Sequence, residues 1–184
     1  MKYILASASP RRRELLHRIL DSFDIQPAIS PETYNDSLFP ENVAVSLAES
    51  KCDEVYLRNP GSVVIACDTI VVLGKEILGK PADEQEASEM LHRLSGKTHQ
   101  VITGVCVRSS IKRESAFEST EVRFNQLTED FIKEYVSSGS PLDKAGAYGI
   151  QDKGVVKEYY GSYTNVVGLP VALVSRLIQE CTTI

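Results

Sequence analysis

Short apolar runs alternate along the chain with segments in which apolar residues recur at helical spacing. The runs predict strands at 3–6, 63–67, 70–73 and 76–78, longer β-like segments at 99–108 and 115–124, and further strands near 24–29 and 155–159. Gly74-Lys75 separates two of these runs and predicts a hairpin turn. Helical spacing predicts helices at 11–20, about 42–56, 83–94, around 131–136 and around 171–178. Because hairpins and helices both occur, we expect an α/β fold with a mixed β-sheet and flanking helices.

Composition narrows the class of protein. Of the 184 residues, 42% are hydrophobic and 24% are charged, which is typical of a globular protein with a sizeable core. We expect a single domain over residues 1–184, with room for two lobes. The net charge of −5 argues against broad nucleic-acid binding but leaves room for a local basic pocket. No apolar run reaches the roughly 20 residues that span a bilayer, so we expect a cytoplasmic protein without membrane partners.

The cysteines and histidines point away from a soft-metal site. No two cysteines form a CxxC pair, which favours reduced thiols and excludes zinc binding by cysteine clusters. The histidines show no ligand spacing either. These residues are Cys52, Cys67, Cys106 and Cys181, and His17, His92 and His99.

The first candidate for chemistry is the segment 7–13, Ser-Ala-Ser-Pro-Arg-Arg-Arg, between a predicted strand and a predicted helix. Unpaired backbone N–H groups at a helix start, serine hydroxyls and guanidinium forks together could capture a phosphate. Alternatively, Ser9 only caps the helix and the arginines are solvated. The local pattern weighs the two interpretations equally.

The second candidate is Asp68 with Thr69, directly after the apolar run 63–67. This order predicts a carboxylate at the C-terminal end of a buried strand, a common ligand position in α/β proteins. A buried carboxylate needs a metal ion, a base or hydrogen-bond donors; the alternative is that Asp68 caps a turn. Glu32, in a polar loop, could join Asp68 in holding Mg²⁺, although alone it has the character of an exposed loop acid.

Two further features are ambiguous by themselves. Lys51 and Lys80 are ordinary surface lysines by default. The segment 143–151 contains small residues that permit close backbone approach, and its Tyr148 and Gln151 could stack on or hydrogen-bond a base. A purely structural turn explains this segment equally well.

Five blocks are specific when taken in order. They are LASASPRRRELL, ACDTIVVLGKEILGKP, LSGKTHQVITGV, PLDKAGAYGIQ and NVVGLP. Together they resemble the Maf family of nucleotide pyrophosphatases, also called septum-formation proteins. The resemblance runs from Leu5 to the final helix, which is nearly the whole chain.

The resemblance implies a fold similar to that of inosine triphosphate pyrophosphatase, with two lobes around a cleft. It implies hydrolysis of nucleoside triphosphates between the α- and β-phosphates, giving the monophosphate and pyrophosphate with a divalent cation, Mg²⁺ or Mn²⁺. A homodimer is a further expectation at the level of the family.

The resemblance also assigns residues. Asp68 matches the family's catalytic acid, and Glu32 joins it as an expected catalytic acid and metal ligand. The expected phosphate-binding residues are Ser7, Arg11, Arg12, Lys51 and Lys80. Arg11, Thr69 and Gln151 match positions that distinguish subgroups, and the residues here resemble the subgroup acting on dTTP and UTP rather than the one acting on 7-methyl-GTP.

Two positions depart from the family pattern. Pro31 stands where an acidic residue usually precedes the Glu32 position, and Asp152 stands where glycine usually follows the Ile-Gln pair. The competing hypotheses are a non-catalytic nucleotide-binding regulator of septum formation and an inosine/xanthosine triphosphate pyrophosphatase. Retention of Asp68 and Glu32 favours an active enzyme.

Overall fold

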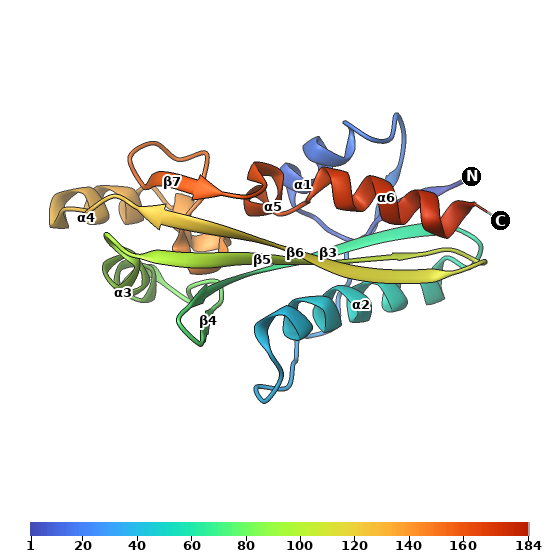
Figure 1. Cartoon of the computed structure of the whole chain (residues 1–184), viewed down its shortest axis with the longest axis horizontal. Helices are drawn as coiled ribbons and strands as arrows, with labels where there is room; N and C mark the ends of the chain where they lie inside the picture. The colour runs from blue at the N-terminus through green and yellow to red at the C-terminus, as the bar shows by residue number, and fades with distance from the viewer. Residues whose placement is uncertain (184) are drawn as a thin grey trace. The chain divides into compact units, whose positions relative to one another are not determined.

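The computed structural model describes residues 1–183 of the chain as an alternation of strands and helices (Figure 1). The strands are β1 (Tyr3–Leu5), β2 (Asp24–Ile25), β3 (Val63–Leu73), β4 (Glu76–Leu78), β5 (Thr98–Arg108), β6 (Arg113–Phe124) and β7 (Val156–Tyr160). The α-helices are α1 (Pro10–Leu16), α2 (Pro40–Arg58), α3 (Glu84–Leu94), α4 (Glu129–Ser137), α5 (Tyr163–Val167) and α6 (Val171–Thr182). Two short 3₁₀ turns occupy Ser140–Asp143 and Ala145–Ala147.

The strands form one sheet in the order β2-β1-β3-β5-β6-β7, and β4 pairs with β3. β1 is parallel to both β2 and β3, whereas the β3–β4 and β6–β7 pairs are antiparallel. The predicted mixed sheet is therefore confirmed. The hairpin turn at Gly74-Lys75 is also confirmed, since Gly74 has a φ of 66° between β3 and β4.

One difference from the sequence prediction changes the position of Asp68. The runs 63–67 and 70–73 were expected to be separate strands, but they form a single strand, β3. Asp68 therefore lies in the middle of a strand, and the prediction that it follows the strand's C-terminal end is wrong. In the sheet β3 lies between β1 and β5, and two polar residues within its apolar run do not end it.

Smaller differences concern element ends. α1 stops at Leu16 rather than residue 20, because the N–H groups of Arg18 and Ile19 turn to tighter, three-residue hydrogen bonds with Leu15 and Leu16. β2 covers only Asp24–Ile25 of the predicted 24–29. Helix α5 was not predicted; its five residues are too few to show helical periodicity.

Contact density divides the chain into two compact units, and the expected single domain over 1–184 stays a prediction. Unit 1 contains Met1–Asp68, Thr103–Glu118 and the C-terminal segment from Gly168. Unit 2 contains Thr69–Ile102 and Ser119–Val167, and the boundary falls within β3, β5 and β6. No helix among the described residues is long and apolar enough to cross a membrane.

In unit 1 the sheet lies between α2 on one face and α6 on the other (Figure 1). The α2 side buries a cluster of small and branched side chains: Ile4, Ala6, Ala48, Cys52, Val55, Val64, Ala66 and Cys106. On the α6 side, the Cys181 thiol lies 3.3 Å from the Val107 carbonyl oxygen. All four cysteines are buried free thiols, and burial raises the pKa of Cys67 to about 11, so this thiol is protonated at neutral pH.

α2 and the sheet approach each other closely at Gly104 of β5. A Cβ atom at this position would lie 2.2 Å from the carbonyl oxygen of Ala44. This separation is far below van der Waals contact, and the obstacle is helix backbone rather than a flexible side chain. Glycine therefore sets the distance at which α2 rests on the sheet.

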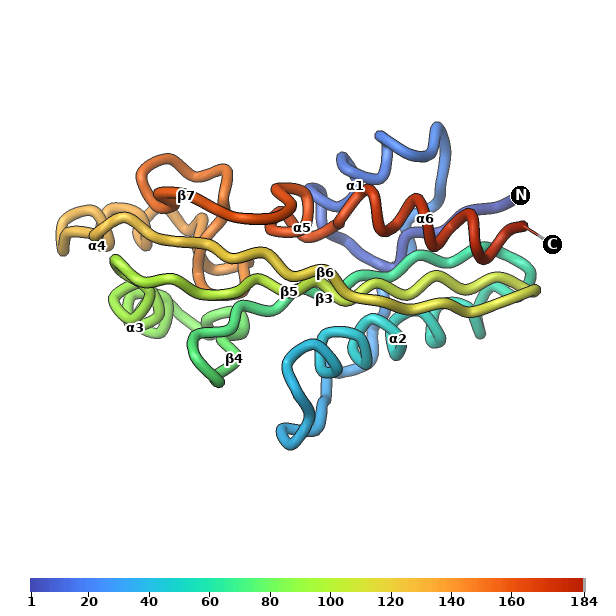
Figure 2. Tube along the Cα trace, viewed as in Figure 1, coloured from blue at the N-terminus to red at the C-terminus, as the bar shows by residue number. Residues whose placement is uncertain are grey.

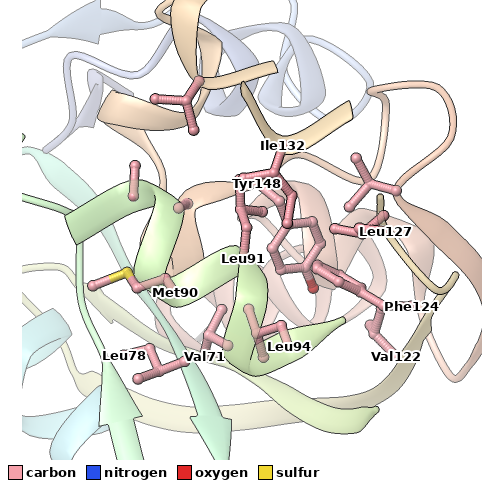
Figure 3. Close-up of a cluster of buried hydrophobic side chains, with 14 of the residues drawn as sticks. Val71, Leu78, Met90, Leu91, Leu94, Val122, Phe124, Leu127, Ile132 and Tyr148 are labelled. Carbon is pink, nitrogen blue, oxygen red and sulfur yellow. The ribbon is translucent and has the colours of Figure 1, made fainter. Parts of the chain in front are cut away.

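In unit 2 the core gathers α3 and α4 around the ends of β5 and β6. Figure 3 shows Tyr148 inside this cluster, close to Leu91, Phe124 and Ile132. The hydroxyl of Tyr148 hydrogen-bonds to Nε2 of His99 at 2.7 Å, and both rings meet Phe124 edge to face. Burial lowers the pKa of His99 to about 4, so its imidazole is neutral at pH 7.

Gly104→Ala tests the contact between α2 and β5. We expect the added methyl group to lower the free energy of unfolding by about 1–3 kcal/mol, the usual cost of overpacking. Urea denaturation measures this loss. Gly79→Ala is the matched control, because nothing lies within 4 Å of its Cβ position and its stability should stay unchanged. Equal stabilities for both variants would contradict the packing argument.

His99→Gln tests the buried neutral imidazole. Between pH 6.5 and about 4, His99 is protonated in the unfolded chain but neutral in the folded protein. Stability is therefore lost as the pH falls through this range. We expect the buried His99 to lower the free energy of unfolding of the wild type by about 2 kcal/mol as the pH falls from 7 to 5. Urea denaturation at both pH values should show a smaller acid loss for His99→Gln than for the wild type. The same acid loss in both proteins would contradict the prediction.

Candidate active site

Asp68 is the centre of the candidate site in unit 1. Strand alternation puts it on the same face as Val64 and Ala66, the row that packs against α2. Its side chain is only 8% exposed. Burying an unpaired carboxylate at such a position would carry a large desolvation cost. The groups that pair with Asp68 therefore determine its charge and its chemistry.

Lys51 of α2 is the principal partner of Asp68. Helical spacing places it beside the buried residues Ala48 and Val55, and the helix thereby delivers its ammonium group to the Asp68 carboxylate. The same Nζ atom lies 2.7 Å from a carboxylate oxygen of Glu32, whose side chain is 55% exposed. One half-buried ammonium group therefore joins a buried and an exposed carboxylate.

Glu54 holds the loop that carries Glu32, a role that the sequence analysis missed. Its carboxylate accepts hydrogen bonds from the backbone N–H groups of Ile29 and Ser30, at 2.9 and 3.1 Å. These bonds hold the pKa of Glu54 below its usual range, led by the one from Ile29. Figure 2 shows this loop projecting past the N-terminal end of α2, on the α2 side of the sheet. No sequence signal pairs a helix glutamate with backbone amides 24 and 25 residues away.

The start of α1 presents Arg12 in a fixed orientation. Its Nε donates to the carbonyl oxygen of Gly168 at 2.8 Å, and its Nη1 lies 3.3 Å from the hydroxyl oxygen of Ser7. Ser9 caps the helix by accepting from the Arg12 N–H, as the structural alternative predicted. Arg12 is not simply solvated, however, and Arg11 beside it is half-buried. The helix cap is therefore confirmed, and phosphate capture by this segment stays a prediction.

The electrostatics of Asp68 reflect two opposing causes. Burial raises the pKa of Asp68 above its usual range, and the Glu32 carboxylate adds to this rise. The charges of Lys51 and Arg12 and the hydrogen bond from Lys51 act in the opposite direction. The net direction is upward, so the carboxylate accepts a proton more readily than an exposed aspartate does.

Glu32 and Asp68 fit a hard divalent cation. Both offer carboxylate oxygens, and Mg²⁺ is usually held by one or two carboxylates together with phosphate oxygens of a substrate. Among residues 1–183 no group of three or more His, Cys, Asp or Glu side chains could form a metal cage. Glu32 and Asp68 together offer the one or two carboxylates by which such an ion is usually held.

Six of the expected residues belong to unit 1, on or beside α1, α2 and β3: Ser7, Arg11, Arg12, Glu32, Lys51 and Asp68. Thr69, Lys80 and Gln151 belong to unit 2, and their part in the site stays a prediction. Lys80 and Gln151 are exposed, as binding residues must be.

The expectation that Tyr148 stacks on a base is wrong. Its ring is only 5% exposed because it fills the core of unit 2 (Figure 3). The segment 145–148 is a structural turn with backbone strain: Ala147 has a φ of 61°, which costs a non-glycine residue about 1–2 kcal/mol. Only Gln151 of the two candidates in this segment can reach a ligand.

A hollow in unit 1, of about 390 Å³, is a poor anion site. Its cationic groups are already paired: Arg108 and Arg113 with Asp53, at 2.5 and 2.7 Å, and Lys112 with Glu114 at 2.7 Å. The hollow is lined by Tyr56, Arg108, Ser109, Ser110, Ile111, Lys112 and Arg113.

Comparison with known proteins identifies relatives over the whole chain. The family model for Maf-like protein matches residues 2–181. The dTTP/UTP pyrophosphatase of Bacillus pumilus strain SAFR-032 is 49% identical and covers 96% of this chain and 94% of its own length. The dTTP/UTP pyrophosphatase of Bacillus velezensis strain DSM 23117 is 46% identical, over 97% and 96% of the two chains.

Solved structures share the fold at much lower identity. A HAM1 protein from Coxiella burnetii superposes with a TM-score of 0.54 at 15% identity, covering 98% of this chain and 99% of that one. The Ham1 protein of Staphylococcus aureus gives 0.52 at 12% identity, with the same coverage. These likenesses confirm the expected mixed α/β fold of the inosine triphosphate pyrophosphatase type.

Asp68→Asn should stabilise the protein at pH 7. The neutral amide keeps the shape of the side chain but removes a charge that burial disfavours, as the raised pKa of Asp68 indicates, while Lys51 keeps Glu32 as an ionic partner. We expect a higher urea midpoint in buffer containing a chelator. The control is Asp24→Asn, which alters an exposed ion pair with Lys2 and should leave the midpoint unchanged. A lower midpoint for Asp68→Asn would mean that attraction to Lys51 outweighs the burial cost.

Proposed function

The chain belongs to the Maf-like family, and from this premise we propose that it hydrolyses nucleoside triphosphates to the monophosphate and pyrophosphate, with dTTP and UTP as preferred substrates. The curated relatives named as dTTP/UTP pyrophosphatases support the reaction and the substrate class. We place the enzyme in the cytoplasm, where it would act on the free nucleotide pool. The observation that carries the proposal is the buried Asp68 joined through Lys51 to Glu32.

Asp68 acts as the general base in this proposal. Its raised pKa and fixed position suit it to accept a proton from a water molecule as the water oxygen attacks the α-phosphorus. The new bond forms between that oxygen and the α-phosphorus, and the bond to the oxygen bridging the α- and β-phosphates breaks. Pyrophosphate leaves with the bridging oxygen, and Asp68 later returns its proton to solvent.

Lys51 keeps Asp68 oriented and offers positive charge to the phosphates. An ammonium group shared by two carboxylates can turn one of its donors to a phosphate oxygen without leaving Asp68. Arg12, held by Gly168 and Ser7, supplies a guanidinium in a fixed orientation for charge that develops on the leaving group. Arg11 and Lys80 complete the expected set of phosphate-binding cations.

Glu32 and Asp68 would hold the divalent cation, Mg²⁺ or Mn²⁺. When bound, the ion supplies Lewis-acid stabilisation of charge on the phosphate oxygens. Glu32 lies on an exposed loop, whereas Asp68 lies on a strand, so the loop side of the pair can adjust to the ion while the strand side stays fixed.

Base choice belongs to other residues in this proposal. A side-chain amide can donate to one edge atom of uracil or thymine and accept from another, and Gln151 is exposed at the surface of unit 2. Thr69 and Arg11 are the remaining expected specificity residues. This separation predicts that catalysis and base preference respond to different substitutions.

Asp68→Asn tests the chemistry. We expect the turnover number for every nucleotide to fall by at least about 100-fold, because the amide cannot accept the proton of the attacking water. Pyrophosphate release from UTP and dTTP with Mg²⁺ or Mn²⁺ measures this loss, and Asp24→Asn should keep wild-type turnover. Wild-type turnover in Asp68→Asn would place the active site elsewhere.

Gln151→Ala tests base recognition. The preference for UTP over GTP is measured as the ratio of the two kcat/KM values. We expect this ratio to fall by the equivalent of about 1–3 kcal/mol, which is the cost of leaving buried polar groups unpaired. Arg12→Ala is the companion variant, and it should weaken turnover of all nucleotides equally because the triphosphate is common to them. A wild-type preference for purines would overturn the substrate assignment.

A further inference from the structure

Asp152, which directly follows Gln151, is tied into unit 2 by its side chain. Its carboxylate oxygen Oδ2 accepts hydrogen bonds from the hydroxyl of Tyr135 on α4 and, at 3.2 Å, from the hydroxyl of Ser140. The Asp152 side chain is therefore neither a solvated surface acid nor turned toward a ligand. It is an internal acceptor shared by two other segments of the same unit.

The same tyrosine reaches the other end of the turn. The Tyr135 hydroxyl oxygen accepts the backbone N–H of Gly149 at 3.2 Å while its proton goes to Asp152. Independently, the Asp152 N–H donates to the Gly149 carbonyl oxygen at 3.0 Å. Residues 149–152 thus form a closed turn, and Gln151 stands exposed within it. We call the three residues Tyr135, Ser140 and Asp152 the turn clamp.

Packing around the clamp explains why glycine occupies position 149. A Cβ atom there would lie 3.0 Å from the Asp152 carboxylate oxygen and 3.0 Å from Cε of Lys144. The Lys144 side chain is 13% exposed, and its ammonium group donates to the backbone and hydroxyl oxygens of Ser140. On the side of Gly149, the clamp is therefore covered by the Lys144 side chain, which its hydrogen bonds to Ser140 hold in place.

We propose that Asp152 and Tyr135 are positioning residues for base recognition: by closing the turn 149–152 at both ends, they fix the direction in which Gln151 presents its amide. This inference rests on the proposed function, because it assigns the clamp to the base preference of the same enzyme. A short turn with free ends would let the amide sample many directions, and each bound base would have to order it. The clamp removes that ordering cost in advance.

Three variants isolate the clamp. Tyr135→Phe removes one oxygen and keeps the ring, Asp152→Ala removes the acceptor, and Asp152→Asn keeps an oxygen that can still accept from Tyr135 and Ser140. Tyr160→Phe is the matched control, because it removes a phenol hydroxyl that bonds to an exposed carboxylate, Glu158, at 3.2 Å elsewhere in unit 2.

The kinetic readout is kcat/KM for UTP and for GTP. We expect Tyr135→Phe and Asp152→Ala to lose about tenfold for UTP, mainly through a higher KM, and to change less than twofold for GTP. The kcat/KM of Asp152→Asn for UTP should lie within about threefold of the wild-type value. The control Tyr160→Phe should match the wild type for both nucleotides. A fall of kcat for both nucleotides alike would indicate a general structural defect and overturn the assignment.

Hydrogen–deuterium exchange gives a second readout that needs no activity. Peptides covering 145–152 should exchange faster in Tyr135→Phe and Asp152→Ala than in the wild type, while β5 peptides keep their protection as evidence of an intact fold. Unchanged exchange in the turn would overturn the clamp itself. Faster exchange with an unchanged UTP-to-GTP ratio would overturn its role in base recognition. A wild type that releases no pyrophosphate from either nucleotide would instead overturn the proposed function.

Discussion

The contact between Lys51 and Asp68 is the interaction on which the rest of the site depends. A carboxylate in the middle of a covered strand would be untenable alone, and the ammonium group from α2 makes it tolerable. The same helix rests close to the sheet at Gly104, where a side chain would collide with the backbone of Ala44. Glu32 then gains its place from the same ammonium group and from Glu54, one turn further along α2. One helix thus organises both acids.

Much of this arrangement could be predicted from the sequence. The strand and helix order, the mixed sheet and the importance of Asp68 followed from apolar patterning and from five ordered blocks of residues. Lys51 read locally as an ordinary surface lysine, and its assignment to the site came from the resemblance to the family. These features can be predicted because each depends on residues that are neighbours in the sequence.

Other features depended on tertiary contacts that no local pattern encodes. The sequence placed Asp68 after a strand, because two polar residues interrupt an apolar run; pairing with neighbouring strands carries the backbone through them. Tyr148 had the composition of a stacking residue, and only the T-shaped contacts with Phe124 and His99 reveal it as a core residue. Glu54 and the Gly168 carbonyl also act at long range along the chain, with partners 24 to 156 residues away.

The burial of Tyr148 has a consequence for how substrate preference can change over evolutionary time. Tyr148 stands three residues before Gln151, and its ring is part of the packed interior of unit 2 (Figure 3). Substitutions that reshape this segment are therefore constrained by core packing, and those that disturb Tyr148 draw on the small free energy of folding. Under the role proposed for Gln151, lineages with stability to spare can explore new bases through this segment, whereas marginally stable ones are confined to exchanging the exposed amide itself.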